Sequence, residues 1–72
     1  MIYYEVYEEY PENHECHTLY GEQLYFEDES DAWDEFEAAK ENGALYATIV
    51  RCEEYAHREI DKTLLEEFIL DK

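Results

Sequence analysis

Alternating hydrophobic and polar positions open the chain. The stretch IYYEVYEE has a period of two and is rich in tyrosine and valine, which is typical of a half-buried strand over Ile2 to Glu9. The turn-forming segment Tyr10-Pro11-Glu12-Asn13 should end this strand. Two faces result, with Ile2, Tyr4 and Val6 on one and Tyr3, Glu5, Tyr7 and Glu9 on the other.

A second strand is expected from Thr18 to Phe26, with Leu24 and Phe26 facing inward and a bulge at Gly21. The short connection between the two strands predicts a hairpin. Ala44 to Glu53 predicts a third strand, because LYATIV is β-branched and aromatic at its centre. The segment Tyr55 to Arg58 fits either an extension of that strand or a turn.

Two segments have helical spacing. In ESDAWDEFEAAKENG, Ser30 is the expected N-cap and Asn42-Gly43 the expected stop. Its apolar side consists of Ala32, Trp33, Phe36 and Ala39. From about Asp61 a second amphipathic helix is expected, with Leu64, Leu65, Phe68 and Ile69 on one stripe. The prediction is a single α+β domain over 1–72: a small antiparallel sheet of about three strands with two helices on one face, in the order ββαβα.

Charge changes this picture more than any other property. The chain has 21 acidic and 5 basic residues in 72, a net charge of −16, together with eight tyrosines. Over a folded surface of roughly 4,800 Å², self-repulsion of this size opposes folding. Such a composition indicates either a saline environment or a cationic partner. It also disfavours direct binding to DNA or to an anionic membrane, since both would repel the chain.

Catalytic and metal-binding patterns are weak. His14, Cys16 and His17, with Cys52 and His57 downstream, are zinc-ligand types, but their spacing matches no common zinc site. A polar hairpin loop and one buried thiol explain them better, and two free thiols fit a reducing compartment. No phosphate loop, nucleophile elbow or calcium loop is present, and no export or membrane-spanning segment. We therefore expect no enzymatic activity, no metal and no cofactor, in a cytoplasmic protein.

The first predicted helix carries the most regular charge. From Asp31 to Glu41 it rises about 15 Å, so five carboxylates give one per ~3–4 Å, close to the ~3.4 Å per phosphate along a DNA strand. A groove of Arg and Lys built for phosphates would meet a similar charge density there, and binding would occlude it. The candidate partner-binding residues are Asp31, Asp34, Glu35, Glu37 and Glu41 on this helix, and Tyr3, Glu5, Tyr7 and Glu9 on the first strand. The Tyr3 face is either an exposed interface or a core face beneath a helix.

A short, strongly acidic, tyrosine-bearing α+β chain resembles the small phage-encoded anti-defence proteins, including anti-CRISPR proteins and anti-restriction DNA mimics. The resemblance covers size, charge and architecture, and no motif assigns residue roles. It implies an inhibitor, a monomer or homodimer in the host cytoplasm, that occupies the basic nucleic-acid-binding surface of a Cas effector or restriction complex. One alternative is an acidic antitoxin or adaptor that neutralises a basic protein without mimicry; another is a halophilic housekeeping domain.

Overall fold

The computed structural model describes residues 1–11 and 19–70. The order of elements is ββαββ: strands β1 (Ile2–Pro11) and β2 (Leu19–Phe26), helix α1 (Glu29–Glu41), and strands β3 (Tyr46–Glu54) and β4 (Ile60–Ile69). The strands form one antiparallel sheet in the order β2-β1-β3-β4. The predicted order ββαβα is therefore wrong in its last element, and the sheet has four strands instead of about three.

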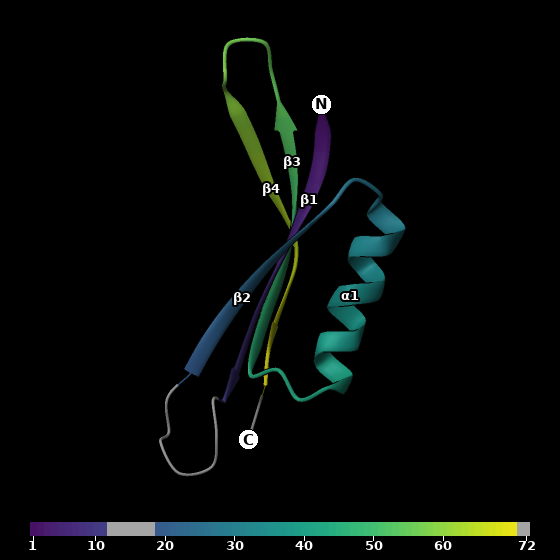
Figure 1. Ribbon diagram of the computed structural model, residues 1–72, viewed down its shortest axis with the longest axis vertical. Coiled ribbons are helices and arrows are strands. Elements are labelled where there is room, and N and C mark those ends of the chain that lie inside the picture. Colours follow the sequence, from purple (N-terminus) through teal and green to yellow (C-terminus); the bar gives the residue numbers. More distant parts are fainter. Residues whose placement is uncertain (12–18, 71–72) are drawn as a thin grey trace.

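Helix α1 covers one face of the sheet and packs against β1, β2 and β3 (Figure 1). It is the only helix among the described residues, so the opposite face carries none. The sheet is strongly twisted, and the β3–β4 hairpin extends past the end of α1 (Figure 1). The described body is correspondingly elongated, with extents of 47 × 21 × 17 Å.

The core lies between α1 and the inward positions of the central strands. Val6 of β1, Ile49 of β3 and Phe36 of α1 are fully buried in it. Alternation along β1 is as predicted, because Tyr4 and Val6 face the helix and the odd-numbered residues face away. Ala32, Phe36 and Ala39 form the buried side of α1, also as predicted, with Trp33 half-buried at its margin.

The ends of α1 confirm one prediction and correct another. The helix begins at Glu29 after an N-cap at Asp28, not at Ser30, and no side chain caps it. Asp28 and Ser30 are both common at this position, so sequence alone distinguishes them poorly. At the other end Asn42 is the C-cap and Gly43 has φ +94°. The left-handed stop was correctly predicted, because glycine adopts this conformation without a steric cost.

The second predicted helix is strand β4. In its pairing with β3, Ile49 lies opposite Glu66 and Val50 opposite Leu64, so Leu65 is an extra, bulged residue. A bulge shifts the alternation by one. Leu65 and Phe68 therefore pack against the core, whereas Leu64 and Ile69 point to the other face and are more than half exposed. The resulting i, i+1, i+4, i+5 spacing of apolar residues is the same as that of a helical stripe, which is why the sequence predicts a helix here.

Two smaller predictions are also settled. Residues 56–57 form the turn between β3 and β4, and Arg58 beside it has φ +66°. The pairing of β1 with β2 has one constant register, so the bulge predicted at Gly21 is wrong. Gly21 instead makes room for the Tyr7 ring, since a Cβ there would lie 2.9 Å from two ring carbons. The segment expected to end the first strand begins too early, because Tyr10 and Pro11 still belong to β1. Glu12 and Asn13 of that segment, and Thr18 at the predicted start of the second strand, lie outside the described residues.

Candidate functional site

The sheet face opposite α1, which we call the open face, carries four tyrosines, of which Tyr25 is exposed and the others are half-buried. Strand register places on it Tyr3, Glu5, Tyr7 and Glu9 of β1, Tyr25 of β2, Tyr46 and Cys52 of β3, and Leu64, Lys62 and Glu67 of β4. The predicted alternative that a helix covers the Tyr3 side is excluded for the described residues. The rings of Tyr3 and Tyr25 lie 6.2 Å apart, as do those of Tyr7 and Tyr46. These pairs order the face across three strands.

Tyrosine hydroxyls hold carboxylates on this face. The Tyr7 hydroxyl donates to Glu9 Oε2 at 2.7 Å, and the Tyr46 hydroxyl donates to Glu67 Oε2 at 3.0 Å. Each of these hydrogen bonds raises the pKa of its tyrosine, because ionisation would set a phenolate against a carboxylate. A neutral donor orients the carboxylate and leaves its charge uncompensated.

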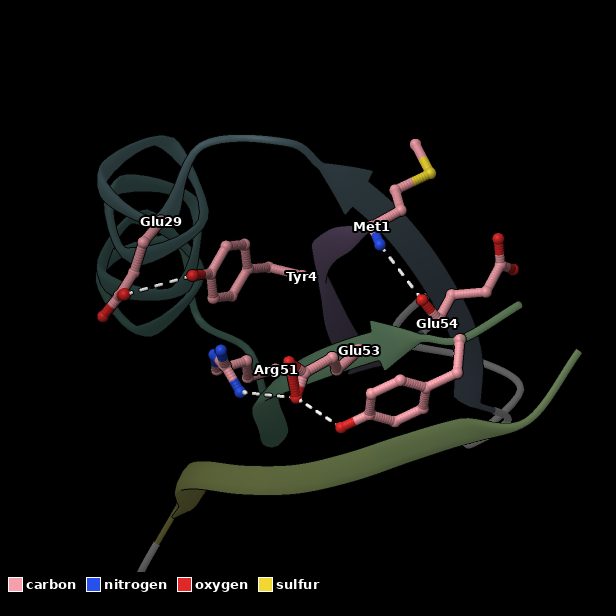
Figure 2. Close-up of polar contacts among 7 residues, drawn as sticks. Met1, Tyr4, Glu29, Arg51, Glu53 and Glu54 are labelled. Carbon is pink, nitrogen blue, oxygen red and sulfur yellow. Dashed lines mark hydrogen bonds and ion pairs between the residues drawn. The ribbon is translucent and has the colours of Figure 1, made fainter. Parts of the chain in front are cut away.

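The same pairing recurs elsewhere. Tyr4 reaches from β1 to Glu29 Oε1 of α1 at 3.2 Å, as Figure 2 shows. Tyr55 donates to Glu53 Oε1 at 2.8 Å, and Arg51 lies 3.8 Å from the same oxygen. Within residues 1–11 and 19–70, ion pairs occur at Glu37, Glu53 and Glu5. In this part of the chain, hydroxyl donors therefore order more carboxylates than cations neutralise.

Glu5 is the exception on the open face. Its residue is 7 % exposed, and Lys62 Nζ of β4 lies 3.2 Å from Oε1 and 3.4 Å from Oε2. The hydrogen bond to Glu5 raises the pKa of Lys62. Beside this pair the Cys52 thiol is fully buried, and desolvation followed by the Glu5 charge raises its pKa. Glu5, predicted as a partner contact, is thus already neutralised within the chain.

The acidic residues of α1 do not all share one surface. Asp31, Asp34, Glu37 and Glu41 are exposed, as predicted, and we call them the helix row. Glu37 is paired with Lys40 at 3.0 Å. Glu35 is half-buried and interacts with Glu8 of β1, so it turns toward the sheet. Without it, four carboxylates span the same ~15 Å rise at intervals of ~5 Å, wider than the spacing predicted from five.

Sequence reasoning missed the buried carboxyl of Glu8. Its residue is 2 % exposed, Oε1 accepts from Tyr10 at 2.7 Å, and no hydrogen bond reaches Oε2. Glu35 of α1 and Glu22 of β2 lie nearby, and desolvation followed by the Glu35 contact raises the Glu8 pKa to about 7. Extending the alternation Tyr4, Val6 by one step would have placed Glu8 on the inward face.

The zinc-ligand residues divide between two parts of the chain. His14, Cys16 and His17 lie outside the described residues, Cys52 is a buried free thiol, and His57 is exposed in the hairpin turn. Among residues 1–11 and 19–70, no three His, Cys, Asp or Glu side chains are arranged to hold a metal ion. In the same part of the chain, no helix combines the length and apolar character needed to span a membrane.

Comparisons with known proteins assign no relationship. No protein-family model matches the chain, and the searches of curated proteins and of solved structures found no match. The tyrosine-held carboxylates of the open face and the helix row are therefore the candidate site on physical grounds alone.

Proposed function

We propose that this protein is an acidic inhibitor that occupies a basic nucleic-acid-binding surface of a host defence or DNA-processing protein. The observation that carries the proposal is the pairing of tyrosine hydroxyls with carboxylates on the open face, at Tyr7–Glu9 and Tyr46–Glu67. These bonds fix the direction of the carboxylates and leave their charge available. The complement of such a surface is a cluster of guanidinium and ammonium groups, which is also what grips phosphates.

The tyrosines would contribute contact area as well as order. A guanidinium that binds a carboxylate can stack on a neighbouring aromatic face. Tyr7 and Tyr46 supply such faces beside Glu9 and Glu67, and Tyr3 and Tyr25 supply two more at the other end of the open face. Tyrosine is moreover enriched at protein interfaces. The open face therefore fits an arginine-rich surface better than a dispersed acidic surface would.

The helix row would act mainly at longer range. Its four exposed carboxylates lie on α1, across the sheet from the open face (Figure 1). The helix row and the open face cannot both contact one flat partner surface. The helix row would therefore steer the approach electrostatically. Alternatively, in a deep groove of the partner, the helix row would contact one wall and the open face the other. In either arrangement, phosphates and this chain compete for the same cations.

The test is capture at low salt from the native host, followed by competition with nucleic acid. The captured protein should lose its DNA or RNA when this chain is bound. Replacing Glu9 and Glu67 by Gln, with Tyr7 and Tyr46 by Phe, should weaken capture while the core remains intact. The comparison variant is Asp34→Lys/Glu37→Lys/Glu41→Lys, which alters the helix row only.

The outcomes separate four explanations. Loss of binding in the open-face variant, together with displacement of nucleic acid, supports the proposal. A greater loss of binding in the helix-row variant would instead indicate that the partner contacts α1. A captured protein that retains its nucleic acid fully would refute occlusion and favour an adaptor or antitoxin that neutralises a basic protein elsewhere. A chain that folds only at high salt would instead be a halophilic domain.

A further inference from the structure

Strand β4 is an open edge of the sheet. It pairs with β3 on one side, and the order β2-β1-β3-β4 leaves its other side unpaired within the described residues (Figure 1). The strand is ten residues long and contains no proline. Ile60, Leu64 and Ile69 are 43 %, 55 % and 63 % exposed. Native proteins usually interrupt or cover an edge of this kind, because its free N–H and C=O groups can pair with another strand.

The bulge at Leu65 determines which β4 side chains share a face. Before it, Ile60, Lys62 and Leu64 lie on the open face, opposite Glu54, Cys52 and Val50 of β3. After it, Glu67 and Ile69 lie on the open face, opposite Thr48 and Tyr46. The open-face residues are therefore even-numbered in the first half of the strand and odd-numbered in the second half.

This change of parity restricts how two copies of β4 can pair. In an antiparallel ladder, directly opposed residues lie on the same face. Where the first half of β4 in one copy meets the second half in the other across a twofold axis perpendicular to the sheet, even-numbered positions must then meet odd-numbered positions. The register that pairs the whole strand is centred between Leu64 and Leu65. It sets Ile60 opposite Ile69, Asp61 opposite Phe68, Lys62 opposite Glu67, and Thr63 opposite Glu66.

We infer that two copies of this chain associate through β4 in that register, forming a continuous eight-stranded antiparallel sheet with both helices on one face. Each dimer contains two Lys62–Glu67 ion pairs and two Ile60–Ile69 apolar pairs, all on the open face. Shifting the register by two residues in one direction opposes Asp61 to Glu66, and shifting it in the other opposes Lys62 to Ile69. Only the centred register gives charge complementarity.

The other edge of the sheet offers no such match. Strand β2, LYGEQLYF, has one charged residue, Glu22, and no cation to oppose it. β4 is therefore the edge whose side chains favour a second copy. This inference concerns the strand edge and needs no basic partner, but Glu67 belongs to both surfaces: its pairing with Lys62 of a second copy would neutralise one of the carboxylates that the proposed function offers to a partner.

Net charge gives the association a distinctive salt dependence. Two chains of −16 repel each other at long range, and salt screens that repulsion more than it weakens two local ion pairs. Dimerisation should therefore strengthen between low and moderate salt. Binding to a cationic partner should weaken over the same range, so the two interactions can be distinguished in one titration.

The test is sedimentation equilibrium of the full chain as a function of protein and salt concentration. The wild-type protein should dimerise, and Lys62→Glu or Glu67→Lys should each weaken the dimer at least about tenfold, because each sets like charges opposite each other twice. The double variant Lys62→Glu/Glu67→Lys should restore it. Lys62→Glu also removes the partner of Glu5, an effect that Glu67→Lys does not repair within the chain, so rescue reports pairing between copies.

The matched control is Lys62→Glu/Glu41→Lys, which has the same net charge as the double variant but changes a residue on α1. It should remain as weak as Lys62→Glu. Equal rescue by both double variants, or a wild-type chain that stays monomeric at millimolar concentration in 0.5 M salt, overturns the inference. Hydrogen exchange checks the interface without any substitution, because the backbone amides of 60–69 should become more protected as the protein concentration rises. If Lys62→Glu does not fold, Glu67→Lys tests the register.

Discussion

Raising the pH from 5 to 8 should destabilise this protein through one buried group, Glu8. The pKa of Glu8 is about 7 in the folded chain and 4.5 without the fold. Between these values the folded state holds a proton that the unfolded state has released. Stability contributed by the protonated carboxyl is therefore fully present below pH 4.5 and is lost as the pH rises through 7.

The magnitude follows from the interval between the two values, since each pH unit corresponds to about 1.4 kcal/mol and the whole interval to about 3 kcal/mol. This is a large share of the stability of a domain of this size. The groups that face Glu8 are Glu35 of α1, Glu22 of β2 and Tyr10 of β1, while the β3 residue opposite it is Ala47. Only the Tyr10 hydroxyl favours the carboxylate, so desolvation and two like charges prevail.

The assay is urea denaturation at pH 5, 6, 7 and 8 for the wild-type chain and Glu8→Gln. Moderate salt should be present, because it screens surface repulsion more than it screens a buried contact. The wild-type free energy of unfolding should fall by about 2–3 kcal/mol more across this range than that of the variant, since part of the interval is already lost at pH 5. At pH 8 the variant should be the more stable of the two.

Parallel pH profiles for the two proteins would refute the conclusion that Glu8 keeps its proton in the folded state up to about pH 7. Glu41→Gln is the matched control, because it removes the same charge from an exposed position on α1. Its pH profile should follow that of the wild type.

Three further predictions concern the strands. Leu65→Ala should lower the free energy of unfolding by about 1–2 kcal/mol, whereas Leu64→Ala should lower it by less than about 0.5 kcal/mol in the dilute monomer. The reason is that only Leu65 packs on the core. Equal losses would contradict the bulge. Gly21→Ala should displace the Tyr7 ring and lower the free energy of unfolding by about 1 kcal/mol, a net value that includes the smaller conformational entropy of the unfolded chain. A Tyr7–Tyr46 contact that is unchanged by NMR would contradict this prediction. In a Cys16→Ser background, Cys52 should react with a thiol reagent far faster in urea than in the native state; equal rates would mean that the thiol is accessible.

Local signals predicted the first half of this fold well. The period of two placed β1, the β-branched and aromatic centre LYATIV placed β3, and the helical period placed the buried side of α1, because each of these elements has one face in the core and one outside. These local signals failed at β4, where the bulge at Leu65 turns a period of two into a spacing that imitates a helix. Distinguishing the two needs the pairing with β3, which is a tertiary contact.

The residues of the candidate site likewise divide into those that the sequence predicts and those that depend on tertiary contacts. Exposure of Asp34 and Glu41 follows from the helical period, so sequence sufficed for them. Glu35 lies at the margin of that face, and its contact with Glu8 depends on how α1 rests on β1. The hydroxyl–carboxylate pairs of the open face were equally hidden, since Tyr46 and Glu67 are 21 residues apart and meet only across β3 and β4.

The projecting β3–β4 hairpin gives the described part of the molecule an uneven charge distribution. Residues 51–62, at the end that extends past α1, hold three basic and four acidic side chains, a net −1. The other described residues hold one basic and fourteen acidic side chains, a net −13. A body 47 Å long with this asymmetry has a large electric dipole along its length. Near a positively charged surface the protein would orient before contact, with its more acidic end toward the surface and the tip of the β3–β4 hairpin pointing away from it.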